Sequence, residues 1–283
     1  MKKILLTGAT GFFGSRIANY YRNNYKIYMP SHQEMDITNE ESARRVFDAF
    51  IPDVVIHCAA ISDVGLCEKE PEKSYRINVE GSINIAKASK RICAKGIICS
   101  SDQVYFGSSI EEPHNEEEVL HPISIYGQHK LKAEQECLSI NPDCVLLRLS
   151  WMYDTRTIRD IEHGDFFRTL LSKVNAKEDV SYPIYDKRGI TDVNEVVAKL
   201  EKAFQIPGGI YNFGSSNDKS TFDTVYELFE KMNWDIRLLH KNEEAFKSNP
   251  RNLCMCQNKI EKHGISFSKT SDGLIRNFLL TLT

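Results

Sequence analysis

The stretch Lys3–Gly14 reads KILLTGATGFFG, and it decides the fold of this chain. A run of strand length, Lys3–Thr7, leads directly into glycines with the spacing G-x-x-G-x-x-G, and a helical pattern follows them. Between a strand and a helix, such glycines allow a tight turn and a close approach to a pyrophosphate, which the first helical N–H groups bind. The predicted ligand contacts come from Gly8, Thr10, Gly11, Phe12, Phe13 and Gly14. A turn without a ligand is the weaker alternative, given the flanking strand and helix.

The first half of the chain alternates apolar, β-rich runs with amphipathic segments of helix length. The predicted strands are Lys3–Thr7, Lys26–Met29, Val54–Cys58, Gly96–Ser100 and Val145–Leu149. The predicted helices are Phe13–Asn23, Glu40–Phe50, Glu72–Cys93 and Ile125–Ser139. Near-continuous apolar strands are buried on both faces, and their alternation with helices predicts a parallel sheet. We therefore expect an α/β protein with a doubly wound parallel-sheet Rossmann fold.

The pattern changes after residue 150, although no linker, repeat or low-complexity tract marks a boundary. Helical segments begin near Asp165, near the capping-box pattern Asp192-x-x-Glu195 and near Ser220. We predict an NAD(P)-binding Rossmann domain at residues 1–150 and a smaller, mainly substrate-binding region at residues 151–283. Elements near residues 190–213 are expected to pack back on the Rossmann domain.

Composition narrows the classes of partner. The formal net charge is -3, from 36 basic and 39 acidic residues spread along the chain, so no basic stripe for nucleic acid is expected. The start, Met1–Gly8, holds too few consecutive apolar residues for a signal peptide or a membrane span. We expect a cytoplasmic protein, with neither nucleic acid nor a membrane as a partner.

The cysteines favour packing over chemistry. Of the eight, Cys58, Cys93, Cys99 and Cys144 lie in or beside apolar runs, where a reduced thiol packs as a small hydrophobic group. Cys254-x-Cys256 has no second Cys or His pair at the spacing of a zinc site. No metal site is predicted.

A tyrosine and a lysine four residues apart, Tyr126 and Lys130, stand at the start of the predicted helix Ile125–Ser139. In a helix this spacing places both side chains on one face. The ammonium is expected to lower the phenol pKa from about 10, which makes Tyr126 a usable proton donor and acceptor. Ser101 follows the preceding strand, where its hydroxyl can face Tyr126 and hydrogen-bond a substrate carbonyl. Taken singly, each of these residues could have a purely structural role. Together, Ser101, Tyr126 and Lys130 predict a catalytic set.

Two polar residues inside apolar strands are interpreted mainly as structural. His57 is expected to be a packed strand residue and not a base. For Arg148, a satisfied buried ion pair and a functional role both stay open.

The ribose end of the predicted cofactor site lacks its usual acid. After the second strand the sequence reads Pro30-Ser31-His32-Gln33, where a carboxylate would normally bind the 2′-hydroxyl of NAD. Without a carboxylate to repel a 2′-phosphate, the cofactor is NADP(H) or NAD(H), with a preference for NADP(H). Ser31 and His32 are the candidate contacts, and no Arg or Lys stands beside them.

Several motifs together resemble an extended short-chain dehydrogenase/reductase. They are Thr7–Gly14, Asp36-Ile37, Ala59-Ala60, Asn78–Gly81, Ser100–Tyr105 and Tyr126–Lys130, and the match spans nearly the whole chain. Within that group, Arg148–Tyr153 and Asn249-Pro250-Arg251-Asn252 resemble the dTDP-4-dehydrorhamnose reductase family. The resemblance implies cofactor contacts from Asp36, Ile37, Ala59, Ala60 and Ile61. It implies substrate contacts from Ser62, Val64, Ser101, Asp102, Gln103, Trp151 and Arg251.

The chain departs from that family at the sugar end of the site. Ser101 replaces a threonine and Gln103 replaces a tyrosine of the family pattern, so recognition of the sugar is expected to differ. Gln103 cannot ionise, so it cannot replace the glutamate that similar nucleotide-sugar dehydratases carry there. Asn249 replaces the arginine of the family's Arg-Pro, which moves an expected phosphate contact to Arg251.

The expected activity is NAD(P)H-dependent reduction of the 4-keto group of a nucleotide-linked sugar, by a monomer or homodimer. A nucleotide-sugar epimerase, which would retain its dinucleotide between turnovers, is one alternative. A non-catalytic dinucleotide-binding regulatory subunit is another, against which the complete Ser-Tyr-Lys set argues.

Overall fold

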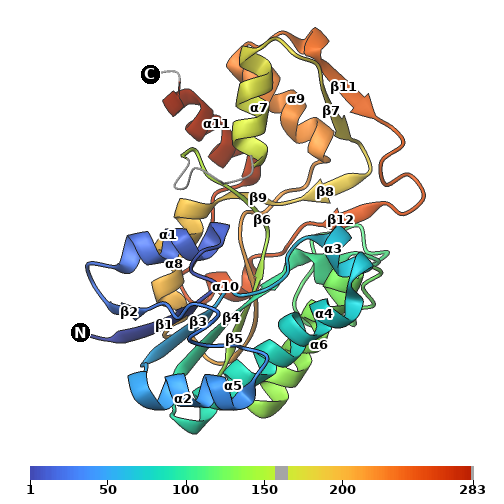
Figure 1. Cartoon of the computed structure of the whole chain (residues 1–283). Helices are drawn as coiled ribbons and strands as arrows, with labels where there is room; N and C mark the ends of the chain where they lie inside the picture. Colours follow the sequence, from blue (N-terminus) through green and yellow to red (C-terminus); the bar gives the residue numbers. More distant parts are fainter. Residues whose placement is uncertain (157–164, 282–283) are drawn as a thin grey trace. The chain divides into compact units, whose positions relative to one another are not determined.

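The computed structural model describes residues 1–156 and 165–281 (Figure 1). The described residues form two compact units. Unit 1 falls within Met1–Val104, Leu120–Arg148 and Val197–Tyr211, and unit 2 within Tyr105–Val119, Leu149–Val196 and Asn212–Thr283. Residues 105–119 therefore belong to unit 2, although they precede the boundary near residue 150 that the sequence suggests.

A six-stranded sheet forms the centre of unit 1, with the strand order β10-β5-β4-β3-β1-β2. Its strands are β1 (Lys3–Thr7), β2 (Lys26–Tyr28), β3 (Val54–His57), β4 (Lys95–Ser101), β5 (Val145–Leu149) and β10 (Gly209–Phe213). Strand β1 pairs in parallel with both β2 and β3, and β3 pairs in parallel with β4. The chain order reverses between β1 and β3, and ligands of open α/β sheets bind at such a switch point, beyond the carboxyl ends of the strands.

Helices α2 (Glu40–Phe50), α5 (Gly81–Arg91) and α6 (Ile125–Ile140) pack side by side along the sheet. Helices α1 (Phe12–Tyr21) and α8 (Val193–Ala203) are joined by a hydrogen bond from the Tyr21 hydroxyl to the Val197 carbonyl, at 2.7 Å. The doubly wound Rossmann fold expected from the sequence is confirmed. None of the described helices has the length and apolar composition that a membrane crossing requires.

The helix expected at Glu72–Cys93 is interrupted. After α3 (Val64–Lys69), the chain forms α4 (Pro71–Tyr75), a π-helical turn at Arg76–Glu80, and then α5. Turns of this kind often lie at functional sites because they change the direction in which a side chain points. Here the turn carries Asn78, which is fully buried.

Unit 2 contains three parallel strand pairs and a helical core. The pairs are β6 (Trp151–Tyr153) with β9 (Ile190–Asp192), β7 (Val180–Pro183) with β11 (Leu239–Asn242), and β8 (Asp186–Arg188) with β12 (Arg251–Leu253). The helices are α7 (Phe166–Asn175), α9 (Thr221–Met232), α10 (Asn258–Glu261) and α11 (Thr270–Thr281). Phe167 of α7 stacks on Phe278 of α11, with ring centres 3.9 Å apart, in an aromatic core.

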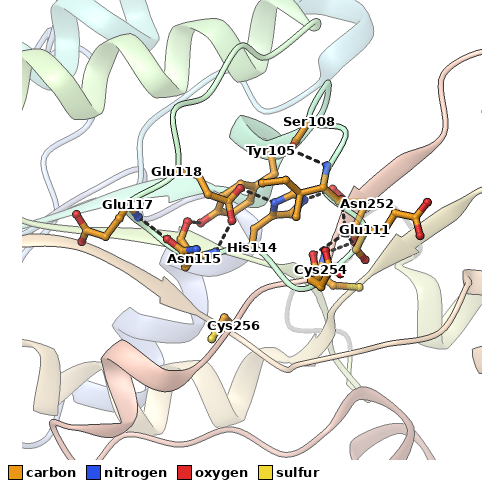
Figure 2. Close-up of polar contacts among 12 residues, drawn as sticks. Tyr105, Ser108, Glu111, His114, Asn115, Glu117, Glu118, Asn252, Cys254 and Cys256 are labelled. Carbon is orange, nitrogen blue, oxygen red and sulfur yellow. Dashed lines mark hydrogen bonds and ion pairs between the residues drawn. The ribbon is translucent and has the colours of Figure 1, made fainter.

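Hydrogen bonds explain why residues 105–119 belong to unit 2 (Figure 2). The Asn252 side chain on β12 donates to the carbonyls of Ile110, Glu111 and Glu112, at 2.9 to 3.1 Å. His114 is fully buried, with Nε2 donating to the Asn252 carbonyl at 3.0 Å and Nδ1 2.7 Å from a Glu118 carboxylate oxygen. These long-range contacts have no periodic signature in the sequence.

A buried ion pair joins α6 to the sheet of unit 1. Arg148 on β5 contacts both carboxylate oxygens of Glu134 on α6, with Nη2 2.7 Å from Oε2, and the Ser100 hydroxyl donates to Oε1. The Arg148 and Glu134 side chains are 2% and 0% exposed. Arg148 therefore has the structural role that the sequence left open.

Removal of one partner of this pair should destabilise the fold. We expect Glu134→Ala to lower the free energy of unfolding by about 3 kcal/mol or more, because it leaves a buried guanidinium without its carboxylate. Urea unfolding of the variant and the parent measures the difference. The matched control is Glu136→Ala on the same helix, whose exposed pair with Lys132 should contribute less than about 0.5 kcal/mol. Equal effects of the two substitutions would contradict the prediction.

Candidate active site

The glycine turn after β1 is shaped by close approaches within unit 1. Gly8 has a φ of +68°, and a Cβ there would lie 2.6 Å from the Ala59 main-chain nitrogen. A Cβ at Gly14 would collide with the Gly8 carbonyl. Both positions need glycine for the fold itself, and the turn is pressed against the residues that follow β3.

Gly11 differs from the other two glycines. It is the N-cap residue of α1, where no side chain caps the helix and no acid stands in the first turn. A Cβ at Gly11 would have only the Gly8 carbonyl oxygen within 4 Å, at 3.3 Å. A side chain at Gly11 would therefore meet one tight contact and no other neighbour, beside N–H groups that no side chain caps. A dinucleotide pyrophosphate has the shape and charge to use this position.

The ribose end of the turn contains a carboxylate that the sequence reasoning missed. Glu34 folds back so that its Oε2 accepts a hydrogen bond from the Ser31 main-chain N–H at 2.7 Å. Hydrogen bonds from Ser31 hold the pKa of this carboxyl below its usual value. The expectation that no carboxylate stands beside Ser31 and His32 is therefore wrong. The chain turns back, and the Glu34 carboxylate lies beside Ser31 although it follows three residues later.

The predicted adenine-contacting residues are held by α5. Asp36 Oδ1 accepts from the Thr38 hydroxyl at 2.8 Å, an arrangement that lowers the Asp36 pKa. Asn84 on α5 donates to the Ile37 carbonyl at 2.9 Å. Gly81 allows this approach, because a Cβ there would lie 2.8 Å from the Ile37 side chain.

The segment after β3 is clamped from two sides. The Asn78 carboxamide accepts from the Ile61 N–H at 2.8 Å and donates to the Ile61 carbonyl at 2.9 Å. Thr7 Oγ1 accepts from the Ala59 N–H at 3.3 Å and lies 2.7 Å from His57 Nδ1. Burial lowers the pKa of His57 to about 3, so this histidine is a neutral packing residue and not a base. Ala59, Ala60 and Ile61 are thus fixed beside Gly8, whereas Ser62 and Val64 are exposed.

The three predicted catalytic residues meet at the carboxyl end of β4. Tyr126 is the second residue of α6, which Ser124 caps by accepting from the Gly127 N–H at 3.1 Å. The Tyr126 hydroxyl hydrogen-bonds Ser101. Lys130 Nζ donates to the Cys99 carbonyl at 2.9 Å and lies 5.8 Å from the centre of the Tyr126 ring.

Burial dominates the electrostatics of this group. It raises the pKa of the Tyr126 phenol, the hydrogen bond with Ser101 acts in the opposite direction, and the Asp102 carboxylate raises it further. Burial also lowers the pKa of Lys130. A lowered phenol pKa is expected from Lys130 together with a positively charged nicotinamide, and it stays a prediction for the protein with its dinucleotide bound. Tyr126 is held as the protonated phenol, the form that donates a proton.

Two buried polar residues follow Ser101. Asp102 is 3% exposed and accepts from the Ser101 hydroxyl at 3.2 Å. Gln103 is 8% exposed, and its carboxamide oxygen is buried without a hydrogen-bond partner. A buried acceptor of this kind costs about 1–3 kcal/mol, which a hydroxyl donor from a ligand would offset.

The remaining candidates, Trp151 and Arg251, lie in unit 2. Arg251 Nε donates to Asp186 Oδ1 at 2.7 Å, and the guanidinium stacks 3.8 Å from the Phe246 ring centre. Trp151 is 38% exposed and lies against Arg188, whose guanidinium carbon is 5.1 Å from the ring centre. Arg188 is a residue that sequence reasoning missed, and the basic pair Lys187-Arg188 in a short strand was its only signal.

Arg188 and Arg251 both contact Asp186, so this cluster of unit 2 combines two cations with one anion. Two nitrogen atoms of the Arg188 guanidinium, Nε and Nη2, are buried and donate no hydrogen bond within the described part of the chain. Within residues 1–156 and 165–281, no group of three or more His, Cys, Asp or Glu side chains can hold a metal ion.

Comparison with known proteins agrees with this arrangement. The family model described as the RmlD substrate binding domain matches residues 1–274. The chain belongs to this family. The residues that match the family model belong to both units, and they include the glycine turn and the arginine cluster.

Similar proteins include a polysaccharide biosynthesis protein, a reductase and a subunit of an adenosyltransferase. Spore coat polysaccharide biosynthesis protein SpsK of Bacillus subtilis is 29% identical, over 94% of this chain and 93% of its own. The dTDP-4-dehydrorhamnose reductase of Aggregatibacter actinomycetemcomitans is 26% identical, over 93% of each chain. The methionine adenosyltransferase 2 subunit beta of Xenopus laevis is 28% identical, over 93% of this chain and 83% of its own.

Among solved structures, the dTDP-4-dehydrorhamnose reductase of Bacillus anthracis, in complex with NADP, superposes with a TM-score of 0.86. It is 25% identical, and the match covers 99% of this chain and 100% of the other.

The space at Gly11 separates cofactor binding from folding. We expect Gly11→Val to weaken dinucleotide binding at least tenfold, or about 1.4 kcal/mol, because the side chain enters the space left for the pyrophosphate. The thermal midpoint should fall by no more than about 4 °C, since only the Gly8 carbonyl has to shift, by a few tenths of an ångström. Fluorescence titration and thermal unfolding measure the two effects. Gly8→Val is the contrasting variant, in which the fold should be lost as well. Unchanged dinucleotide affinity in Gly11→Val would refute the site.

The Glu34 carboxylate should set the preference between the two cofactors. We expect Glu34→Gln to raise the ratio of NADPH to NADH affinity several-fold, because it removes a negative charge that repels a 2′-phosphate. Paired titrations with the two dinucleotides measure the ratio. Glu41→Gln, which removes an exposed carboxylate bound to Arg44 on α2, should leave the ratio unchanged. The same ratio in the Glu34 variant and the parent would count against the assignment.

Proposed function

We propose that this protein is an NAD(P)H-dependent oxidoreductase that reduces the 4-keto group of a nucleotide-linked sugar, like the dTDP-4-dehydrorhamnose reductases it resembles. The carrying observation is the buried Tyr126 beside Ser101 at the end of β4, with Lys130 Nζ 5.8 Å from the centre of its ring. This group lies in the same unit as the glycine turn. A reductase needs both a proton donor and a dinucleotide site.

The cofactor, NADP(H) or NAD(H), supplies the hydride when it is bound. Residues Gly8–Gly14 would hold its pyrophosphate, Asp36 and Ile37 would contact its adenine, and Ala59–Ile61 would line it. The Ser101 hydroxyl binds the substrate carbonyl oxygen and Tyr126 gives its phenolic proton to that oxygen as it becomes a hydroxyl. Lys130 supplies a fixed positive charge that stabilises the phenolate left behind.

The polar residues around this set support a sugar as the substrate. The unpartnered carboxamide oxygen of Gln103 can accept from a sugar hydroxyl, and the Asp102 carboxylate is a second acceptor. Gln103 has no acidic proton, which disfavours elimination of water from the sugar. In unit 2, the excess positive charge of Arg188 and Arg251 suits the pyrophosphate of a nucleotide. Trp151 beside them offers an aromatic surface for the sugar.

The two alternatives predict different states of the purified protein. An epimerase returns its hydride to the same substrate and keeps its dinucleotide, whereas a reductase releases it. A regulatory subunit binds a dinucleotide without turnover, as the similarity to a methionine adenosyltransferase subunit allows. We propose the cytoplasm as the compartment, because all eight cysteines are free thiols and the reaction needs reduced nicotinamide.

Tyr126→Phe tests the proposed chemistry, because it removes only the hydroxyl. We expect NAD(P)H to bind the variant as it binds the parent, while kcat for reduction of a nucleotide-linked 4-keto sugar falls about 10²-fold or more. Stopped-flow oxidation of NAD(P)H with the 4-keto sugar measures the rate, and fluorescence titration measures binding.

An exposed tyrosine outside the proposed catalytic set provides the control for Tyr126→Phe. Tyr185→Phe, at an exposed tyrosine of unit 2, should leave kcat unchanged. A Tyr126→Phe enzyme with parental turnover eliminates the mechanism. A parent protein that binds the dinucleotide but turns over none of a broad panel of nucleotide-linked keto sugars would favour the regulatory alternative.

A further inference from the structure

Two thiols lie in contact between neighbouring strands of unit 1. Cys58 follows β3 directly, Cys99 lies in β4, and their sulfur atoms are 3.5 Å apart. The parallel register pairs His57 with Ile98, so the next pair along the two strands is Cys58 with Cys99. Both side chains therefore project to the same face of the sheet.

The backbone separation suits a disulfide. In-register neighbours on adjacent strands lie about 4.8 Å apart, within the roughly 4.4–6.8 Å that separates the Cα atoms of disulfide-bonded cysteines. The sulfur atoms must close from 3.5 Å to a bond of about 2.05 Å, a displacement that side-chain rotation and a small strand shift can supply together.

The exposure of the two cysteines and the pKa of Cys58 determine how the pair reacts with an oxidant. Cys58 is partly exposed and Cys99 is buried, so an oxidant in solution meets Cys58 first. The hydrogen bond with Cys99 and burial raise the pKa of the Cys58 thiol, whereas the Lys130 ammonium lowers it. The raised pKa of the Cys58 thiol slows its oxidation near neutral pH, so the reduced pair should persist until an oxidant is abundant.

We propose that Cys58 and Cys99 form an oxidation site, at which a peroxide converts the two thiols to a disulfide and reversibly closes the dinucleotide site. In the first step, Cys58 thiolate attacks a peroxide oxygen; hydrogen peroxide is reduced to water and the sulfur is oxidised to sulfenic acid. In the second step, the Cys99 sulfur attacks the Cys58 sulfur, the S–S bond forms, and the sulfenic oxygen leaves as water. Two thiols are oxidised for each peroxide reduced.

A disulfide between Cys58 and Cys99 would affect the dinucleotide site, because both residues contact parts of that site. The Cys99 carbonyl accepts the hydrogen bond from Lys130 Nζ at 2.9 Å. The Cys58 carbonyl carbon would lie 2.7 Å from a Cβ on Gly8, so the glycine turn is already packed closely against Cys58. The small strand shift that accompanies closure of the two sulfurs displaces at least one of these two close contacts. The expected loss of dinucleotide affinity rests on the function proposed above, whereas formation of the bond does not.

The experiment treats the reduced protein with hydrogen peroxide, blocks the remaining thiols with N-ethylmaleimide, and maps the peptides by mass spectrometry. We expect a linked Cys58–Cys99 peptide, formed faster at higher pH. Dinucleotide affinity should fall by about tenfold or more, and dithiothreitol should restore it. Cys93→Ser removes an exposed thiol outside the pair and should not change any of this.

The two single variants complete the test. Cys58→Ser and Cys99→Ser, each compared with its own untreated sample, should give no linked peptide and no reversible loss of affinity. Sulfinic acid on Cys58 without linkage to Cys99 overturns the proposal, as does a linked protein with unchanged dinucleotide affinity. If the reduced protein binds no dinucleotide, the function proposed above fails, and the linked peptide still decides whether the oxidation site exists.

Discussion

A carboxylate buried between a helix and a sheet sets the geometry on which the rest of unit 1 depends. Glu134 must remain paired with Arg148, because an isolated charge at full burial would cost several kcal/mol. That requirement fixes the rotation of α6 about its axis. Residues four apart share one face of a helix, so Lys130 and Tyr126, four and eight positions earlier, point to the same strands. The stripe is polar, and each member has a partner at the end of β4: Ser100, the Cys99 carbonyl and Ser101 in turn.

A second set of close contacts gives the switch point its rigidity. The Gly8 turn touches Ala59, Thr7 holds the Ala59 N–H, and Asn78 clamps Ile61 from the π-helical turn. Each contact joins residues far apart in sequence, and none of the elements can shift alone. A site in this state pays little conformational entropy when a dinucleotide binds, which favours affinity without a large closing motion.

The parts that could be predicted from the sequence are those encoded locally. The glycine spacing, the apolar strands and the Tyr126–Lys130 interval each follow from the geometry of a single element, and the structure contains all of them. Long-range contacts leave no such pattern. Glu34 is brought back to Ser31 by a turn. Arg188 becomes a candidate only when Asp186 and Arg251 are seen beside it. Residues 105–119 belong to unit 2 because Asn252 hydrogen-bonds them. The π-helical turn at Arg76–Glu80 likewise cannot be predicted from helical periodicity.

Burial of Tyr126 also bears on the direction of the chemistry. An epimerase must first oxidise its substrate, so it begins with a phenolate that removes the proton of a sugar hydroxyl. A reductase begins with the phenol. Burial and the Asp102 carboxylate both raise the pKa of Tyr126, and the hydrogen bond with Ser101 offsets them only in part. The protonated form therefore persists above neutral pH, and the first step that it can perform is to donate. Before a dinucleotide binds, this environment holds Tyr126 in the protonated form, which is the form in which a reductase begins its reaction.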